Sequence, residues 1–223
     1  MKNYTLLRGI PLFADLDDDA VRALAERAAV RDCEAEERIV NQSESIQAFY
    51  LVLSGRVKIF RSNAEGKEQI LYLIAAGQPF CFCTAFTDTP YPVSVTALEK
   101  SRVADIPASA MEDLARQQPL LLLKIMQTLA SRLLEAMSLV DSLSLLGTRE
   151  RVAAFLLHEE AAARAGEGRA FILSISHREM AKILATTPET LSRTIQKFRK
   201  DRLIEASGRT IRILDRAGLR AER

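Results

Sequence analysis

The chain of 223 residues has three cysteines, two histidines and no tryptophan. An odd number of cysteines without metal-finger spacing argues against a disulfide framework. No apolar run is long enough to span a bilayer, and the start, MKNYTLLRGIPLF, lacks the apolar stretch of a signal peptide. We therefore expect a cytoplasmic protein that does not enter the membrane.

The sequence also lacks the motifs of common enzymatic chemistry. It contains no nucleophile elbow, P-loop, Rossmann glycine fingerprint or cluster of metal ligands. Its two histidines, His158 and His177, both lie in the C-terminal half. We expect neither an enzyme nor a metal site.

Charge is unevenly distributed along the chain. The first 146 residues hold fifteen basic and nineteen acidic residues, a net charge of −4, whereas the rest, from Gly147, hold sixteen and ten, a net charge of +6. An acidic front and a basic back indicate a sensing module joined to a nucleic-acid-binding module.

Short β-rich runs occupy residues 29–106, after a small helix expected within residues 11–30. The runs are Phe49–Leu53, Val57–Phe60, Ile70–Ile74, Val93–Leu98 and Val103–Ile106. Many short strands separated by turn signals are typical of a β-sandwich or jelly roll. We predict a β-roll sensor domain at residues 1–116.

A long helical run follows Pro119 and reaches about Leu145. Its apolar positions alternate in steps of four and three: Leu122, Met126, Leu129, Leu133, Ala136, Val140 and Leu143. This is a heptad seam. The helix could pack on its own domain, but the run continues beyond the compact size of a sandwich, which favours a parallel homodimer. We predict a dimerisation helix at residues 117–146.

Residues 176–200 predict two short helices joined by a tight turn. Ser176 is a candidate N-cap of the first helix, with Glu179 placed to complete a capping box. Thr187 is a candidate N-cap of the second, because Pro188 follows at the first helical position.

The second of these helices is amphipathic, with Leu191, Ile195 and Phe198 on one face. The other face carries Glu189, Ser192, Arg193, Gln196 and Lys197. A polar helix face of this kind suits reading of the DNA major groove. A helical hairpin with a solvated face, or a scaffold domain that binds protein rather than DNA, would show the same pattern.

A hairpin signal, Leu203–Ala206 and Thr210–Leu214 around Ser207-Gly208-Arg209, follows the two helices. A hairpin directly after a recognition helix is a winged arrangement, which places Arg209 and Arg212 to contact phosphate. We predict a winged helix-turn-helix DNA-binding domain at residues 147–223, and an α+β fold for the whole chain.

The order of these parts resembles the CRP/FNR family of bacterial transcription regulators over nearly the whole chain. In the roll the resemblance rests on residues 39–42, 49–57, 64–71 and 77–80; in the last domain it rests on Glu179, Ile183, Glu189, Thr190 and Arg193. It implies a homodimer that binds double-stranded DNA with two-fold symmetry and has RNA polymerase as a partner.

The spacing Glu189-x-x-Ser192-Arg193 is similar to the FNR-type pattern, which implies a TTGA-like half-site. The cyclic-AMP type has glycine in place of Ser192. Arg193 can donate two hydrogen bonds to guanine, and Glu189 can accept a hydrogen bond from a cytosine amino group. One departure from the family is Ala185, which stands where the turn usually has glycine.

The effector is left open: a small molecule, a gas or a redox signal. The alternative of a cyclic-nucleotide receptor is disfavoured, because the family's phosphate-binding glutamate is replaced by an aromatic residue and no arginine occurs between Arg61 and Arg102. An iron–sulfur cluster with four thiolates from one subunit is excluded by the cysteine count.

The candidate effector residues are Cys81, Phe82 and Cys83. In an extended segment both thiols would face one pocket, and Phe80 and Phe82 would lie on the opposite face. They are either two small buried hydrophobic residues or a redox or haem site. Phe80-Cys81-x-Cys83 resembles the carbon-monoxide-sensing haem activators of the family, whose histidine ligand is replaced here by Cys83, so this resemblance implies a ligand role for Cys81 only.

Overall fold

A computed structural model describes residues 2–44, 47–81, 92–163 and 168–222. The chain divides into two compact units, residues 1–134 and residues 135–223, called here the N-terminal and C-terminal units. The first combines helices with two β-sheets, and the second carries the two-helix motif and a small sheet. The predicted α+β class and its order of parts are confirmed.

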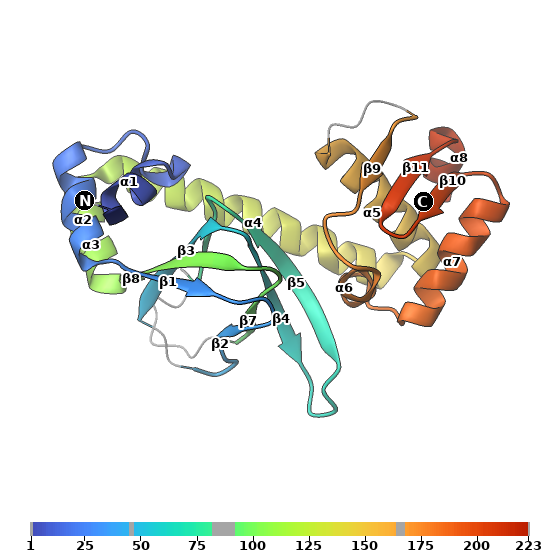
Figure 1. The fold of residues 1–223 in the computed structure, drawn as a ribbon, viewed down its shortest axis with the longest axis horizontal. Helices are drawn as coiled ribbons and strands as arrows, with labels where there is room; N and C mark the ends of the chain where they lie inside the picture. Colours follow the sequence, from blue (N-terminus) through green and yellow to red (C-terminus); the bar gives the residue numbers. More distant parts are fainter. Residues whose placement is uncertain (1, 45–46, 82–91, 164–167, 223) are drawn as a thin grey trace. The chain divides into compact units, whose positions relative to one another are not determined.

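Two antiparallel sheets form the β-roll of the N-terminal unit, in the strand orders β1-β8-β3-β6 and β2-β7-β4-β5. The strands are β1 (Ala29–Cys33), β2 (Arg38–Val40), β3 (Ala48–Ser54), β4 (Arg56–Ser62), β5 (Glu68–Ala75), β6 (Pro79–Phe80), β7 (Ser94–Ala97) and β8 (Ser101–Pro107). Each of the five predicted runs overlaps one of these strands, and the run Val93–Leu98 exceeds β7 by one residue at each end. Figure 1 shows the β4–β5 hairpin extending beyond the other strands.

Side chains that alternate along the strands fill two cores. Val52 and Val103 from the first sheet meet Ile59 and Val95 from the second in a cluster between the sheets. Residues of the opposite parity on β3 and β8, including Phe49, pack against helices. This division follows from the two-residue period of a strand.

Those helices are α1 (Lys2–Arg8), η1 (Pro11–Phe13), α2 (Asp18–Arg27), α3 (Ala108–Gln117) and the start of α4 (Pro119–Leu145). Asp18 and Asp19 lie in the first turn of α2, where the helix dipole favours acidic side chains. Figure 1 shows α1, α2 and α3 gathered at one end of the sheets.

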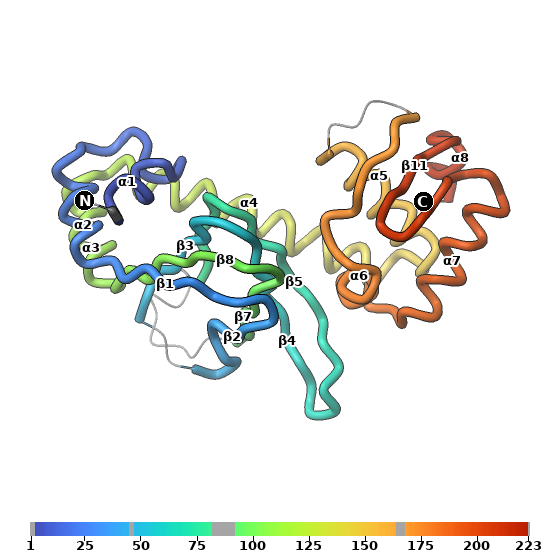
Figure 2. The backbone as a smooth tube through the Cα atoms, in the orientation of Figure 1, coloured from blue at the N-terminus to red at the C-terminus, as the bar shows by residue number. Residues whose placement is uncertain are grey.

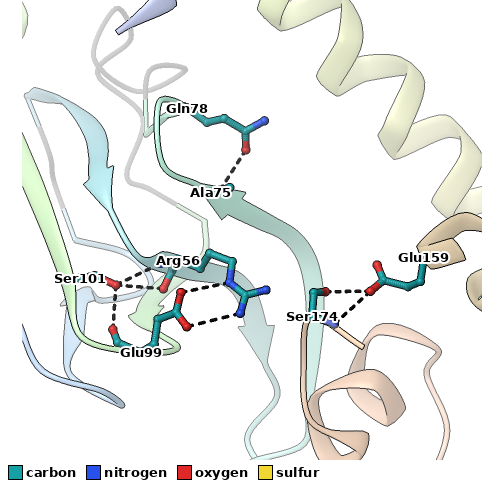
Figure 3. Close-up of polar contacts among 7 residues, drawn as sticks. All are labelled: Arg56, Ala75, Gln78, Glu99, Ser101, Glu159 and Ser174. Carbon is teal, nitrogen blue, oxygen red and sulfur yellow. Dashed lines mark hydrogen bonds and ion pairs between the residues drawn. The ribbon is translucent and has the colours of Figure 1, made fainter. Parts of the chain in front are cut away.

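Gly55 joins β3 to β4 at a close approach of two turns. Its φ is +79°, and a Cβ there would lie 2.4 Å from the Ser101 hydroxyl oxygen, so only glycine fits. That hydroxyl donates to the Glu99 carbonyl at 2.7 Å and accepts from the Arg56 N–H at 3.2 Å (Figure 3). In the same figure the side chain of Gln78 accepts from the N–H of Ala75 at 3.0 Å, which closes the turn after β5.

Helix α4 is buried on one side only. Leu121 and Ile125 join the helical core, and the Tyr72 hydroxyl of β5 donates to the Arg132 carbonyl at 3.1 Å. Many apolar side chains of α4 are exposed: Leu120, Leu122, Leu123, Met126, Leu129, Leu133, Leu134, Met137, Val140 and Leu145. None of the helices in the described ranges combines the length and apolar character needed to cross a membrane.

The C-terminal unit packs helices against a three-stranded sheet of order β10-β11-β9. Its elements are α5 (Thr148–Ala162), β9 (Ala170–Ile172), α6 (His177–Ile183), α7 (Pro188–Lys200), β10 (Ile204–Ser207), β11 (Thr210–Ile213) and α8 (Arg216–Ala221). Figure 2 traces the path of the backbone from α6 into α7. The segment before α6 is held to α5, because the Ser174 hydroxyl donates to the Glu159 carboxylate at 2.9 Å (Figure 3).

Candidate nucleic-acid interface

The predicted start signals of both motif helices are present. The Ser176 hydroxyl accepts from the N–H of Glu179 at 3.2 Å, so Ser176 caps α6. The Thr187 hydroxyl accepts from the N–H of Thr190 at 3.2 Å, so Thr187 caps α7, and Pro188 follows at the first helical position. These caps satisfy N–H groups that a helix start leaves without partners.

The turn between the helices passes through Ala185 in the left-handed region, at φ +48°. The N–H of Thr186 then bonds the Ala181 carbonyl at 3.0 Å, which closes the C-terminal end of α6. The turn therefore requires a backbone conformation that glycine adopts without cost and alanine does not.

Helix α7 has a buried face and an exposed face. Leu191, Ile195 and Phe198 are buried, as the apolar spacing predicts. Every predicted DNA-contacting residue of the motif is exposed: Thr187, Glu189, Ser192, Arg193, Gln196 and Lys197. The helix thus presents to solvent a row of side chains that can donate and accept hydrogen bonds.

Glu189 stands at the start of α7, where backbone N–H groups point outward. A backbone N–H at its own position, with the Thr187 hydroxyl, holds the pKa of the Glu189 carboxyl below its ordinary value. The carboxylate is therefore ionised at neutral pH and acts only as an acceptor. That property suits a base edge that offers an amino group.

The C-terminal end of α7 is held by Arg149 of α5. Nη2 of Arg149 donates to the Asp201 carboxylate at 2.9 Å, and the same guanidinium bonds the Glu222 carboxylate. The guanidinium carbon of Arg149 also lies 5.0 Å from the centroid of the Phe198 ring. Sequence reasoning missed this cluster, because its members are far apart in the chain and no motif marks them.

The wing follows α7. Strands β10 and β11 pair antiparallel, and Gly208 takes a φ of +57° in the turn that joins them. Arg209 is exposed in this turn, and its carbonyl accepts from the N–H of Leu173 at 2.8 Å. Arg212, on β11, pairs with Glu205 at 3.3 Å.

In the roll, Cys81 is buried, with 3% of its surface exposed, in the cluster between the sheets. Its φ is +58°, so the prediction of extended backbone at Cys81 is wrong. A left-handed residue breaks the alternation of a strand, and Phe80 and Cys81 consequently join the same cluster. Phe80 stacks on Tyr50, with ring centroids 5.2 Å apart. Phe82 and Cys83 lie outside the described residues.

Several basic side chains of the described roll are paired with carboxylates. One of them is buried: Lys58 of β4, 2% exposed, pairs with Glu68 at 3.4 Å. Three arginines of the roll, Arg31, Arg56 and Arg102, are engaged at its surface with Glu37, Glu99 and Asp32. A cyclic phosphate buried in the roll would need a paired cation, and the cations named here already have carboxylate partners.

Two family models match the chain. The Crp-like helix-turn-helix domain matches residues 150–222, and the cyclic nucleotide-binding domain matches residues 30–118. The second match concerns the domain type and does not identify a ligand.

Curated relatives cover most of the chain. Transcriptional activator protein Anr of Pseudomonas protegens is 31% identical over 209 residues, which are 92% of this chain and 84% of that protein. The fumarate and nitrate reduction regulatory protein of Vibrio cholerae is 29% identical over 185 residues, 82% of this chain and 74% of that protein.

Solved structures share the fold. FixK2 of Bradyrhizobium japonicum has a TM-score of 0.74 at 24% identity and covers 87% of this chain and 96% of its own. A CooA mutant of Carboxydothermus hydrogenoformans has a TM-score of 0.78 at 22% identity, with 88% of each chain covered. With a sensor-type β-roll, a long helix, a Crp-like helix-turn-helix and regulators rather than enzymes as relatives, this chain belongs to the CRP/FNR family of DNA-binding transcription regulators.

Proposed function

We propose that this regulator binds DNA as a homodimer and reads a TTGA-like palindrome through α7. The observation that carries the proposal is the exposed face of α7, on which Glu189, Ser192 and Arg193 stand within one helical turn of one another. Helical spacing directs side chains three and four positions apart to the same side.

Each of these side chains has a distinct role in the proposal. Arg193 donates two hydrogen bonds to guanine O6 and N7, and the ionised Glu189 accepts from a cytosine amino group. Ser192 contacts a base of either kind. A good bidentate contact contributes roughly 1–3 kcal/mol of discrimination. Gln196 extends this row, and Thr187, Lys197 and Arg209 contribute to backbone contacts.

The proposal of a homodimer rests on α4. We propose that residues 117–146 are the dimerisation segment, between a sensor domain at residues 1–116 and a DNA-binding domain at residues 147–223. Leu122, Met126, Leu133 and Val140 of the predicted seam are each between 47% and 63% exposed in the single chain. A second copy of the helix would cover them. Two recognition helices would then match successive major grooves about 34 Å apart.

RNA polymerase is proposed as the protein partner. The support is that a relative with 92% coverage of this chain is named a transcriptional activator. An activator has to act on the transcription machinery, so the same kind of contact is expected here.

The test is a competition gel shift with a TTGA-containing palindrome and a scrambled duplex, at several salt concentrations. Arg193→Ala should lose the preference for the palindrome and retain weak, salt-sensitive binding. Arg116→Ala, an exposed arginine of α3, is the matched control and should keep the preference. Full discrimination by Arg193→Ala would contradict the assigned role, and a wild type without any palindrome-specific shift would favour the protein-binding alternative.

We propose further that the signal, a small molecule, a gas or a redox change, is sensed in the β-roll and that Cys81 takes part. The support is the position of Cys81, a non-glycine residue in the left-handed region beside the Tyr50–Phe80 stack. Left-handed residues of this kind cluster at functional sites. Haem is one candidate for the receiver of this signal, with the Cys81 thiol as its proposed ligand.

Purification with haem available, followed by absorption spectra of the wild type and of Cys81→Ser, separates the candidates. A Soret band that shifts or disappears in Cys81→Ser supports haem at this position. No band, with identical DNA binding of wild type and Cys81→Ser under oxidising and reducing conditions, would assign Cys81 to packing alone.

A further inference from the structure

An open groove of about 910 Å³ lies between the C-terminal half of α7 and the wing. Gln196, Arg199 and Lys200 of α7 line one side, with Arg202 of the following turn. Glu205 and Arg212, on the solvent-facing side of the wing sheet, line the other.

The turn after α7 directs these cations to the groove. Asp201 is the C-cap of α7, and Arg202 takes a left-handed φ of +56° with its N–H bonded to the Arg199 carbonyl at 3.1 Å. The chain reverses there and continues into β10, so α7 and the wing face each other across the groove. Arg202 thereby joins Arg199 and Lys200 at its edge.

The groove carries a strong excess of positive charge. Its lining includes four basic residues and one acidic residue. The acid, Glu205, already pairs with Arg212 at 3.3 Å, whereas Arg199, Lys200 and Arg202 have no carboxylate at ion-pair distance in the part of the chain that the structure describes. Three exposed cations so close together repel one another, and a polyanion would relieve that repulsion.

We propose that this groove holds the sugar–phosphate backbone beside the bases that α7 reads. The inference rests on the proposed DNA reading, since Gln196 belongs both to the reading face and to the groove wall. Arg199 and Arg202 act on phosphate and not on base edges, so they contribute affinity that depends on salt and not on sequence.

The experiment compares two variants that each remove two positive charges per chain. Arg199→Gln/Arg202→Gln changes the groove; Lys100→Gln/Arg116→Gln changes exposed cations of the N-terminal unit and is the control. Dissociation constants are measured between 50 and 200 mM salt on the palindrome and on a scrambled duplex. Melting curves check that both variants fold, which is expected because all four side chains are exposed.

Because the proposed homodimer carries the change in both copies, the groove variant removes four positive charges and should lower the slope of log affinity against log salt by about 3.6, at roughly 0.9 per lost phosphate contact. Across this fourfold salt range, it should lose roughly 150-fold less affinity than the wild type. Its preference for the palindrome over the scrambled duplex should stay the same, and the control should match the wild type in both respects.

A second measurement locates the contacts. Replacement of single phosphates by uncharged methylphosphonates should weaken the wild type at a few positions and leave the groove variant unaffected at the same positions. Equal sensitivity of the two proteins at every position, or an unchanged salt slope on both duplexes, would overturn the inference. A wild type that shows no preference for the palindrome would contradict the proposed base reading and not the groove. The groove would still be tested by the salt slope on the scrambled duplex.

Discussion

Arg149 of α5 holds Asp201, the C-cap of α7, through a hydrogen bond of 2.9 Å from Nη2 to the carboxylate. The same guanidinium bonds Glu222 next to the end of the chain and covers the ring of Phe198. One side chain thus joins α5, α7 and the C-terminal residues. The end of the recognition helix farthest from the Thr187 cap is fixed by charge as well as by apolar packing.

Replacement of Arg149 by glutamine should lower the free energy of unfolding by about 1 kcal/mol, because the hydrogen bonds lie in a partly exposed cluster. Arg149→Lys should lose part of this amount, since lysine keeps the charge without the planar fork. Thermal and urea unfolding measure both. Equal stability of the wild type and Arg149→Gln would show that packing of Phe198 alone holds this end of α7.

The stability of this cluster should depend on pH through Glu222. Its hydrogen bond with Arg149 lowers the pKa of the Glu222 carboxyl below the ordinary value of 4.5. A depressed carboxyl pKa contributes stability that is present above the ordinary value and is lost as the pH falls through the folded value. The difference in unfolding free energy between wild type and Glu222→Gln should therefore be constant above about pH 5.5 and shrink below pH 4.5. A difference that does not change between pH 3.5 and 7 would contradict this account.

The turn of the motif should be stabilised by Ala185→Gly. Alanine at φ +48° carries a steric cost of roughly 1–2 kcal/mol, part of which is offset by the larger entropy that glycine loses on folding. We expect a net gain of about 0.5–1 kcal/mol in thermal unfolding. Ala154→Gly, within α5, is the matched control and should lower stability by about 1 kcal/mol. A loss of stability in Ala185→Gly would mean that the alanine methyl group makes a compensating contact.

The proposed dimer should be disrupted by Leu133→Arg. Leu133 is 63% exposed in the single chain and lies on the predicted seam of α4. A charge at this position would be buried without a partner between two copies of the helix. Sedimentation velocity should show a shift from dimer towards monomer. Ser131→Arg places the same charge on another side of the helix and should leave the dimer intact; dissociation of both variants, or of neither, would contradict the seam.

The start and apolar face of α7 could be predicted from the sequence because they depend on residues close together in the chain. The cap at Thr187 uses the N–H of Thr190, three residues on. Pro188 disfavours a helical conformation at the residue before it, so the helix cannot begin earlier. Leu191, Ile195 and Phe198 are buried at the spacing of a helical face. Local interactions of this kind can be predicted from the sequence without knowledge of the fold.

At Cys81 local reasoning failed. An extended segment was predicted, in which Cys81 and Cys83 would face the same side, but the backbone turns into the left-handed region directly after β6. The strand is placed by the pairing of Phe80 with Tyr50 of β3, thirty positions earlier. No pattern in neighbouring residues encodes such a distant pairing.

The sequence by itself determined the order of the parts, the strands and helices, and the polar face of α7, because hydrophobic period and capping act over a few residues. Only the tertiary structure decided which distant charges meet. Arg149 bonds Asp201, 52 positions away in the sequence, and Arg199 and Arg202 line a groove together with the wing. The physical reason is that a surface charge has a similar free energy whether it is paired or solvated. Its partner is therefore determined by the folded backbone, and the pairing produces no periodic pattern in the sequence.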